Sequence, residues 1–312
     1  MFAYFVRRIL QMIPTILGVI LMLFLLFNFF AGDPAQILAG KMPNPERIAA
    51  IRKELGLDEP WFVQLWVFFK QVVTFDFGRS WTTNEQVSQL LAARLPVTLT
   101  IMLPVWVLEA AIAVVLALGV AYVRGTLTDR VVMAICTASM SISLLLYAVV
   151  GQWVFGSVLG WAPVQGWGDD LATNLSTYAW LPILLILFVA ITPSLRLYRS
   201  FVVEEINQDY VRTARAKGVS DNRIMFVHVL RNASIPIVTN MALSLPGLVV
   251  GSFIIEQIFS IPGIGREVIV AVEKSDFPVI KAITIMVAFV TMFANLIVDV
   301  LYKVLDPRVE LK

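Results

Sequence analysis

The stretch ILQMIPTILGVILMLFLLFNFFA, residues 9–31, decides the fold class of this protein. It carries no charged side chain and exceeds the ~20 residues that a helix needs to cross a bilayer's hydrocarbon core. The apolar part of a signal peptide spans only about 7–15 residues and ends at a small-residue cleavage site. We therefore expect the block, which follows Arg7 and Arg8, to be an uncleaved first membrane-spanning helix.

Five further apolar blocks of comparable length follow along the chain. They cover residues 97–123, 131–159, 180–197, 235–258 and 279–302. Hydrophobic residues make up 59% of the 312 positions and charged residues 15%, against about 45–50% and about 25% in soluble domains. Ten-residue alternating strands are absent from the sequence, and helices are the other structure that satisfies a backbone in lipid. The sequence predicts an all-α integral membrane protein with six transmembrane helices.

The basic residues between the spans predict the orientation. With a cytoplasmic N-terminus, 14 of them fall on the cytoplasmic side: Arg7, Arg8, Arg124, Arg130, Arg196, Arg199, Arg212, Arg215, Lys217, Arg223, Arg231, Lys303, Arg308 and Lys312. The short loops on the other side hold only Arg266, Lys274 and Lys281. Because short cytoplasmic loops carry the excess of lysine and arginine, we expect both termini inside.

Four parts follow from this topology. They are a tail with the first span (1–31), an extracytoplasmic helical segment (32–96), a five-span core (97–302) that includes a cytoplasmic loop (198–234) between spans four and five, and a cytoplasmic tail (303–312). In the outer segment, Asn44 is expected to cap a helix that begins at Pro45. Residues 61–77 mix aromatic and polar side chains, which favours a helix at the membrane interface.

The cytoplasmic loop contains the sequence DYVRTARAKG at residues 209–218. Short side chains at Thr213, Ala214 and Ala216 predict a helix with a thin surface, which Gly218 would end in a left-handed conformation. Ser220 and Asp221 could cap a second helix. Such an exposed helical hairpin is either a docking element for another protein or a linker between spans four and five.

At these residues the sequence resembles the permease subunits of ABC importers for dipeptides, oligopeptides and nickel. In the broader consensus of the permease coupling loop, three residues separate Glu-Ala-Ala from the Gly that follows. Ala214 and Gly218 match that consensus, while Arg212 and Thr213 replace its Glu and first Ala. The resemblance also rests on GDPA (32–35), LGLDEP (55–60), DFGRS (76–80), RLPVTLT (94–100), HVLRNA (228–233), FSIPGIG (259–265), NLIVD (295–299) and LDPR (305–308).

The resemblance implies a subunit of an ATP-driven importer in the bacterial cytoplasmic (inner) membrane. This chain would form the pathway with a second homologous permease, and an extracytoplasmic substrate-binding protein would deliver the substrate. Two ATPase subunits would receive the coupling loops. The implied coupling residues here are Asp209, Tyr210, Arg212, Thr213, Ala214, Arg215, Ala216, Lys217 and Gly218. Dipeptides, longer peptides, glutathione-like thiol peptides, nickel chelates and oligosaccharides all lie within the resemblance.

The sequence offers no means of binding ATP through a phosphate loop, because it contains no Gly-x-x-x-x-Gly-Lys-Ser/Thr motif. We therefore expect a non-enzymatic chain that binds no cofactor, with ATP and magnesium on the partner subunits. The only histidine, His228, and the only cysteine, Cys136, cannot build a metal cluster together. The net charge of +2 does not suggest a nucleic-acid partner. Besides the protein subunits, the expected partner is membrane lipid.

Two other classes of protein remain as alternatives. A subunit of a membrane enzyme would need ligands, nucleophiles or proton relays in its spans, and these are scarce. A secondary transporter or channel would show paired broken helices in two halves, and the sequence has no evident internal repeat.

Individual polar residues in the spans are further candidates. Glu109, about 12 residues into the second span, either lines the pathway or a subunit interface, or pairs with a hydroxyl or backbone group. Glu256 either holds the turn at Pro262 and Gly263 or contacts the binding protein. Asn295 and Asp299 are four residues apart and share one helix face, which favours a structural anchor.

The third span departs from the family pattern. Where many members have a proline, this chain reads Ser141-Ile142-Ser143-Leu144. Because proline bends helices, its absence predicts a straighter third helix.

Overall fold

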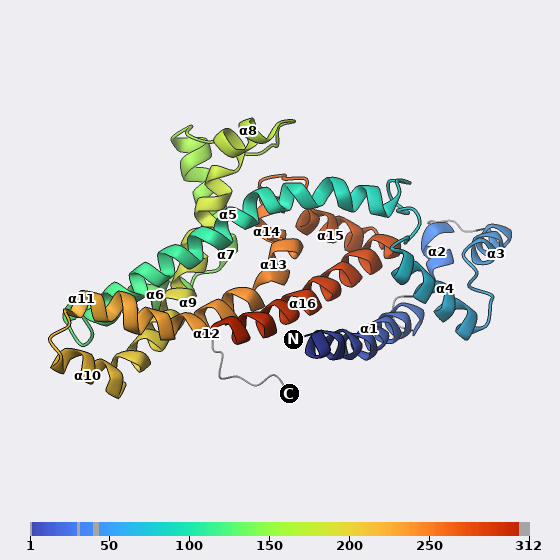
Figure 1. Ribbon diagram of the computed structural model, residues 1–312. Coiled ribbons are helices and arrows are strands. Elements are labelled where there is room, and N and C mark those ends of the chain that lie inside the picture. Colours follow the sequence, from blue (N-terminus) through green and yellow to red (C-terminus); the bar gives the residue numbers. More distant parts are fainter. Residues whose placement is uncertain (1, 30–31, 40–43, 306–312) are drawn as a thin grey trace. The chain divides into compact units, whose positions relative to one another are not determined.

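The computed structural model describes residues 2–29, 32–39 and 44–305, and Figure 1 shows the elements along the chain. The expected tail at 306–312, with Arg308 and Lys312, lies outside the described residues. The regular secondary structure of the described residues is helical, apart from an isolated antiparallel bridge between Arg79 and Gln86. This confirms the all-α fold class.

The helices of the first half are α1 (Phe2–Phe29), α2 (Pro34–Ala39), α3 (Pro45–Glu54), α4 (Trp61–Thr74), α5 (Val87–Tyr122), α6 (Leu127–Met140), α7 (Leu144–Gly151), η1 (Gln152–Val158), α8 (Leu171–Thr173) and η2 (Asn174–Tyr178). Those of the second half are α9 (Trp180–Ile206), α10 (Asp209–Ala216), α11 (Asp221–Arg223), η3 (Ile224–Val229), α12 (Leu230–Leu243), α13 (Leu245–Val250), α14 (Phe253–Ile258), α15 (Ile264–Glu273) and α16 (Phe277–Leu305). The η elements are π-helical.

Five segments within the described residues are long and apolar enough to cross a membrane. They are Leu10–Phe29, Val87–Tyr122, Trp180–Ile206, Asp221–Ile258 and Phe277–Leu301. A sixth candidate consists of Leu127–Met140 and Leu144–Val158, which meet at 88°. The chain is therefore a multi-span membrane protein with five or six crossings.

This bent pair is the third apolar block of the sequence, so the expectation of a straighter helix there is wrong. The side chain of Ser143 caps the new helix α7 by accepting a hydrogen bond from the Leu146 N–H. The Ser141 hydroxyl donates to the carbonyl of Thr137, one turn back. Short hydroxyl side chains compete for backbone groups in this way, and they end and restart the helix without a proline.

The described chain falls into two compact units. The first contains residues up to 96 together with 267–293. In it α1 packs against α4, and α3 begins at Pro45, with the Asn44 side chain accepting from the Glu46 N–H. The expected Asn44 cap is thus confirmed. Ser80 donates to the buried carboxylate of Asp276, which joins the segment after α4 to the start of α16.

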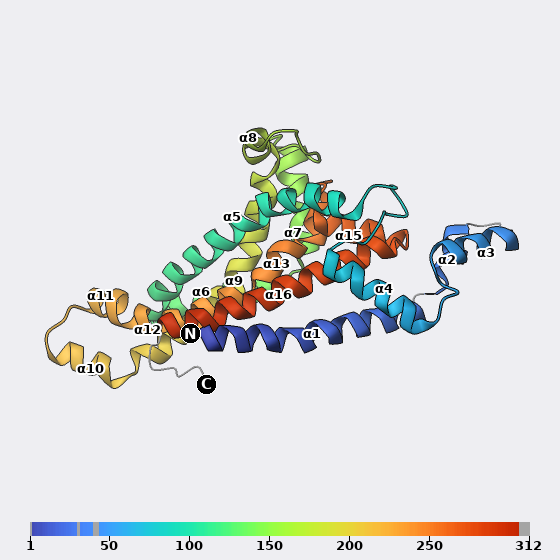
Figure 2. The same cartoon turned by 45° about the vertical axis from the view of Figure 1, so that its right-hand side comes forward.

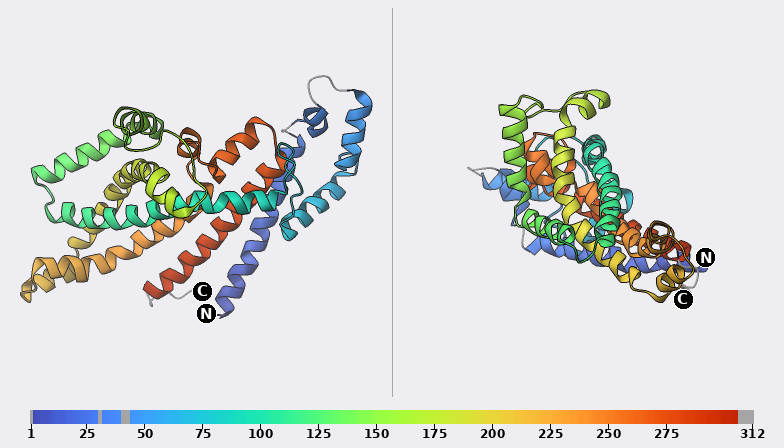
Figure 3. Two further views of the ribbon diagram at one scale, coloured as in Figure 1. Left: turned by 90° about the horizontal axis from the view of Figure 1, so that it is seen from above. Right: turned by 90° about the vertical axis from the view of Figure 1, so that its left-hand side faces the viewer.

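The second unit contains residues 97–266 and 294–305. Within it α9 packs against both α6 and α12. One hydrophobic cluster joins α5, α6, α9 and α12 to α10 and η3, and a second joins α5, α7, α9 and α14. In Figures 2 and 3 the hairpin of α10 and α11 lies beyond the end of α12, so the first cluster is the one that positions it.

Candidate functional site

The helix expected in the cytoplasmic loop is present as α10, Asp209–Ala216. Asp209 lies in its first turn and Arg215 in its last, which is the charge order that the helix dipole favours. Gly218 follows with φ +75°, so the predicted left-handed glycine stop is confirmed. Ser220 precedes α11 in an extended conformation but makes no side-chain cap.

The inner face of α10 is anchored in the core of the second unit. Val211 has no exposed surface and belongs to the cluster that contains Val202 of α9 and Ile224 of η3. Ala214 packs against the same cluster from the next turn of α10. An eight-residue helix is too short to be stable alone, and this burial holds it in place.

A partly buried hydrogen bond fixes the start of α10. The Tyr210 hydroxyl donates to Glu205 Oε2 at 2.7 Å, at the end of α9. Burial, followed by the neighbouring carboxylate of Glu205, raises the pKa of Tyr210 to about 12. The phenol therefore stays protonated at neutral pH and remains the donor.

The outer face of α10 and of the turn after it is exposed. It carries short and basic side chains, with one acid: Asp209, Arg212, Thr213, Arg215, Ala216 and Lys217. Arg212 pairs with Asp209 at 3.3 Å and Arg215 with Asp221 at 2.9 Å, but all four side chains are about half exposed or more, so these pairs add little stability. The face is thin, basic and open to a partner.

Glu256, Pro262 and Gly263 come together at a buried turn. The Glu256 side chain is 1% exposed, and its carboxylate accepts hydrogen bonds from the Thr98 hydroxyl (3.0 Å) and from the Arg266 N–H (3.0 Å). A Cβ added to Gly263 would lie 2.4 Å from Glu256 Oε2. The geometry is that of a carboxylate that holds the turn from inside.

Glu109 is half-buried on α5 and interacts with the hydroxyl of Ser194 on α9. One turn further along α9, the Tyr198 hydroxyl donates to Asn240 Oδ1 on α12 at 3.3 Å. Glu109 is thus placed beside a polar connection across three helices. A role in the pathway stays a prediction.

The structure does not bring Asn295 and Asp299 to any of these sites. They lie one turn apart on α16, with Asn295 exposed and Asp299 half-buried. Their anchoring role stays a prediction.

A partly buried ion pair between α6 and α9 was not predicted from the sequence. Arg199 Nη2 lies 2.8 Å from Asp129 Oδ2, which also accepts from the Gly125 N–H. The Thr126 side chain caps α6 by accepting from the Asp129 N–H. Thr126 followed three residues later by an acid is a capping signal that could have placed Asp129 at this helix start.

Comparisons with known proteins match the whole length of the chain. Residues 113–311 match the family described as binding-protein-dependent transport system inner membrane component, and residues 1–102 match its N-terminal family. The putative peptide transport system permease protein of Brucella abortus (strain 2308) is 35% identical over 99% of both chains. The glutathione transport system permease protein GsiC of Salmonella typhi is 34% identical over 100% of both chains.

The apolar helices and the exposed basic hairpin thus belong to a multi-pass membrane transport protein. The chain is a member of the family of binding-protein-dependent transport system inner membrane components. It is a permease subunit of an ABC importer of the bacterial cytoplasmic membrane, as the motifs in the sequence predicted. The alternatives of a membrane enzyme subunit and of a secondary transporter or channel are not favoured.

Proposed function

We propose that this permease forms, with a second homologous permease, the pathway for peptides or related small solutes. An extracytoplasmic binding protein delivers the substrate, and two separate ATPase subunits supply the energy. The names of the peptide and glutathione permeases that it resembles support this substrate class. The chain binds no cofactor of its own, and ATP with magnesium sits on the ATPase subunits.

The hairpin of α10 and α11 is the docking element for one ATPase subunit. The observation that carries this proposal is the division of α10 into a buried and an exposed face. Val211 is fully buried, while Thr213 and Ala216 present short side chains outward. A groove on the ATPase subunit can contact such a backbone closely. The hydrophobic cluster behind α10 holds the hairpin in position.

This role requires both termini and the hairpin to lie in the cytoplasm. The 14 basic residues assigned to that side support the orientation. Residues 32–96 and the loop between η1 and α8 then face the outside.

Retention of the ATPase subunits by the tagged, purified permease tests the docking proposal. Ala216→Trp places a large side chain on the exposed face of α10 without touching its buried side. We expect the variant to reach the membrane in normal amount but to lose the ATPase and uptake. Thr128→Trp, exposed in the first turn of α6, is the matched control and should retain both. Normal ATPase retention by Ala216→Trp contradicts the proposal.

A further inference from the structure

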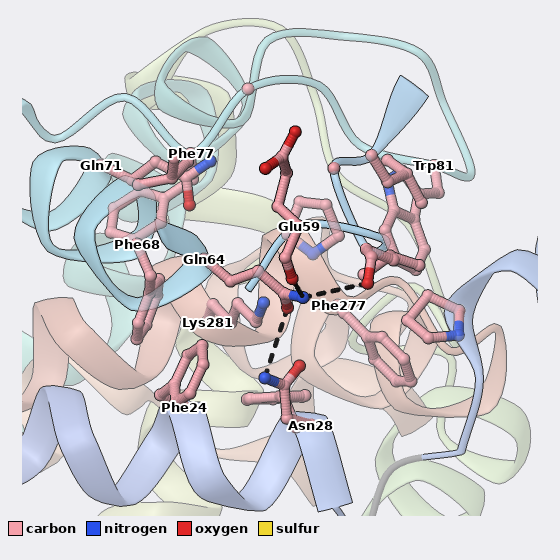
Figure 4. A pocket seen from close by; sticks show the side chains of 18 of the residues that line it. Phe24, Asn28, Glu59, Gln64, Phe68, Gln71, Phe77, Trp81, Phe277 and Lys281 are labelled. Atoms are coloured by element: carbon pink, nitrogen blue, oxygen red, sulfur yellow. Dashed lines mark hydrogen bonds between the residues drawn. The ribbon is translucent and has the colours of Figure 1, made fainter. Parts of the chain in front are cut away.

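A cavity of about 320 Å³ lies within the first unit, and Figure 4 shows its lining. Its walls come from the end of α1, the turn after α3, α4, the segment after α4 and the start of α16. The volume is at the lower end of the range for small-molecule sites. Neither the outer face of α10 nor the buried turn at Glu256 contributes to this lining, so the cavity is separate from both sites.

The ammonium group of Lys281 lies in this cavity between two aromatic rings. Nζ is 5.1 Å from the ring centroid of Phe27 and 5.1 Å from that of Phe68, and both rings are buried. Among the residues that the structure describes, none accepts a hydrogen bond from Nζ or forms an ion pair with it. Glu59 lines the same cavity, but its carboxylate points away from Lys281 (Figure 4). Two ring faces alone do not neutralise a desolvated ammonium.

Three other polar side chains of the wall, Gln64, Asn28 and Arg79, already have partners. Gln64 Nε2 donates to the carbonyls of Leu57 (3.0 Å) and Glu59 (2.8 Å), and Asn28 Nδ2 donates to Gln64 Oε1. The guanidinium of Arg79 donates to the carbonyl of Asn84. Lys281 is therefore the cation of the lining that lies over the two buried rings, and its donors remain for a ligand.

The surface beside the cavity has the character of a membrane interface. On α4, Trp61, Phe62 and Trp66 are 64%, 59% and 65% exposed, and exposed aromatic side chains gather at headgroup depth. Five other residues of the same helix line the cavity itself: Val63, Gln64, Val67, Phe68 and Gln71. The cavity is thus lined by a helix whose exposed aromatic side chains are typical of the depth of the lipid phosphates.

An apolar groove on α1 leads along the helix to Asn28, at the edge of the cavity. Gly18, Leu21 and Leu25 line the groove, and Asn28 lines the cavity. These four positions recur every three or four residues and form one row along the helix, while Phe24 and Phe27 point into the cavity from the neighbouring buried face. The absent side chain at Gly18 deepens the groove, since nothing lies within 4 Å of the position that its Cβ would take.

We propose that this cavity binds the headgroup of an anionic phospholipid. The phosphate lies against the Lys281 ammonium, the glycerol packs on the buried phenyl rings, and one acyl chain follows the groove of α1. A basic pocket between membrane helices selects anionic headgroups by charge, and the aliphatic groove selects a molecule with a chain. The inference goes beyond transport, because it makes the permease dependent on the lipid around it.

Native mass spectrometry of the delipidated, assembled transporter tests the site. The probes are dioleoyl phosphatidylglycerol and dioleoyl phosphatidylcholine. We expect the anionic lipid to bind about tenfold more tightly, and Lys281→Met to remove that preference. Lys281→Arg should retain it. Lys274→Met, an exposed lysine seven residues earlier, is the matched control and should bind as the wild type does. Equal binding of both lipids to the wild type overturns the proposal without any variant.

A second variant tests the acyl chain. Gly18→Leu fills the groove and should weaken dioleoyl phosphatidylglycerol severalfold while leaving short-chain dihexanoyl phosphatidylglycerol unaffected. A Gly18→Leu protein that binds both lipids normally but loses the second permease assigns the groove to that interface instead. Displacement of the lipid by millimolar inorganic phosphate identifies a free-anion site, and displacement by a transported peptide identifies a substrate site. Each of these results overturns the lipid proposal.

Discussion

Thr98 donates a hydrogen bond of 3.0 Å to Glu256 across 158 positions of the chain. Its hydroxyl also accepts from the Ile264 N–H at 2.8 Å. One side chain on α5 thus satisfies both the buried carboxylate on α14 and the first amide of α15.

Replacing Thr98 by valine keeps the shape but removes both hydrogen bonds. The buried Ile264 N–H loses its acceptor and the Glu256 carboxylate loses one of its donors, which is expected to lower the free energy of unfolding by about 2–4 kcal/mol. Thermal unfolding of the solubilised permease measures the loss. Thr98→Ser keeps the hydroxyl and should stay close to the wild type. Equal melting temperatures for Thr98→Val and the wild type would show that water replaces the threonine.

Gly263→Ala should fail for a steric reason. The added Cβ would lie 2.4 Å from Glu256 Oε2 and 2.5 Å from Thr98 Oγ1, and neither atom can move without breaking the turn. We expect a large fall in the amount of folded protein, measured by fluorescence-detected size exclusion. Gly247→Ala in α13 meets nothing within 4 Å and should be neutral or stabilising by up to about 1 kcal/mol. Comparable yields of the two variants would contradict the crowding at Gly263.

Gly218→Val tests the left-handed stop after α10. Open space surrounds this glycine, so the cost comes from forcing a β-branched residue to φ +75°. We expect uptake and ATPase retention to fall at normal membrane abundance. Gly218→Asn should be tolerated because asparagine adopts this conformation readily. Wild-type uptake by the valine variant would remove Gly218 from the coupling element.

The pair of Arg94 and Glu267 predicts a pH effect. Burial raises the pKa of Glu267, although Arg94, 3.4 Å away, opposes the shift. A raised pKa in the folded state means that the protonated acid favours folding. The stabilisation is complete below the unfolded pKa of about 4.3, and it is lost as the pH rises through the folded value.

Glu267→Gln should therefore match the wild type near pH 4 and melt about 2–4 °C higher at pH 7, which corresponds to about 1 kcal/mol. Arg94→Met should be more harmful at pH 7 than at low pH, because it leaves the carboxylate without its cation. Melting curves across this range decide the matter. A glutamine variant that is less stable at pH 7 than the wild type would reverse the sign assigned to Glu267.

Single cysteines test the orientation. Asp169→Cys and Asn222→Cys lie at exposed positions on opposite sides of the proposed topology, and the native Cys136 is buried. A membrane-impermeant maleimide is added to cells whose outer membrane is permeabilised and whose cytoplasmic membrane is intact. It should label the first cysteine and not the second. Labelling of Asn222→Cys under these conditions would place the hairpin outside, away from any cytoplasmic ATPase.

The local features of the fold were predictable from the sequence because neighbouring residues determine them. Apolar length located the spans, Asn44 before Pro45 located a helix start, and small residues before Gly218 located α10 and its end. The break at Ser141–Ser143 was not predicted, since the missing proline indicates a straighter helix while the capping by Ser143 depends on where the helix restarts.

Long-range features were not predictable in the same way. Asp129 and Arg199 are 70 positions apart, and only the packing of α6 on α9 brings them together. The sequence places Lys281 only among the basic residues of the extracytoplasmic loops, because nothing near it in the sequence indicates its contact with the rings of Phe27 and Phe68. A single sequence without its tertiary contacts cannot show such pairs.

The complete burial of Val211 has a mechanical consequence. Its side chain shares one close-packed cluster with Ala117 of α5, Val202 of α9 and Val229 at the end of η3, and such packing resists compression. A push on the outside of α10 is therefore transmitted as a movement of helix axes, and the loop does not absorb it by bending. The hairpin is therefore rigidly connected to the membrane helices, and Val211 is the side chain that connects them.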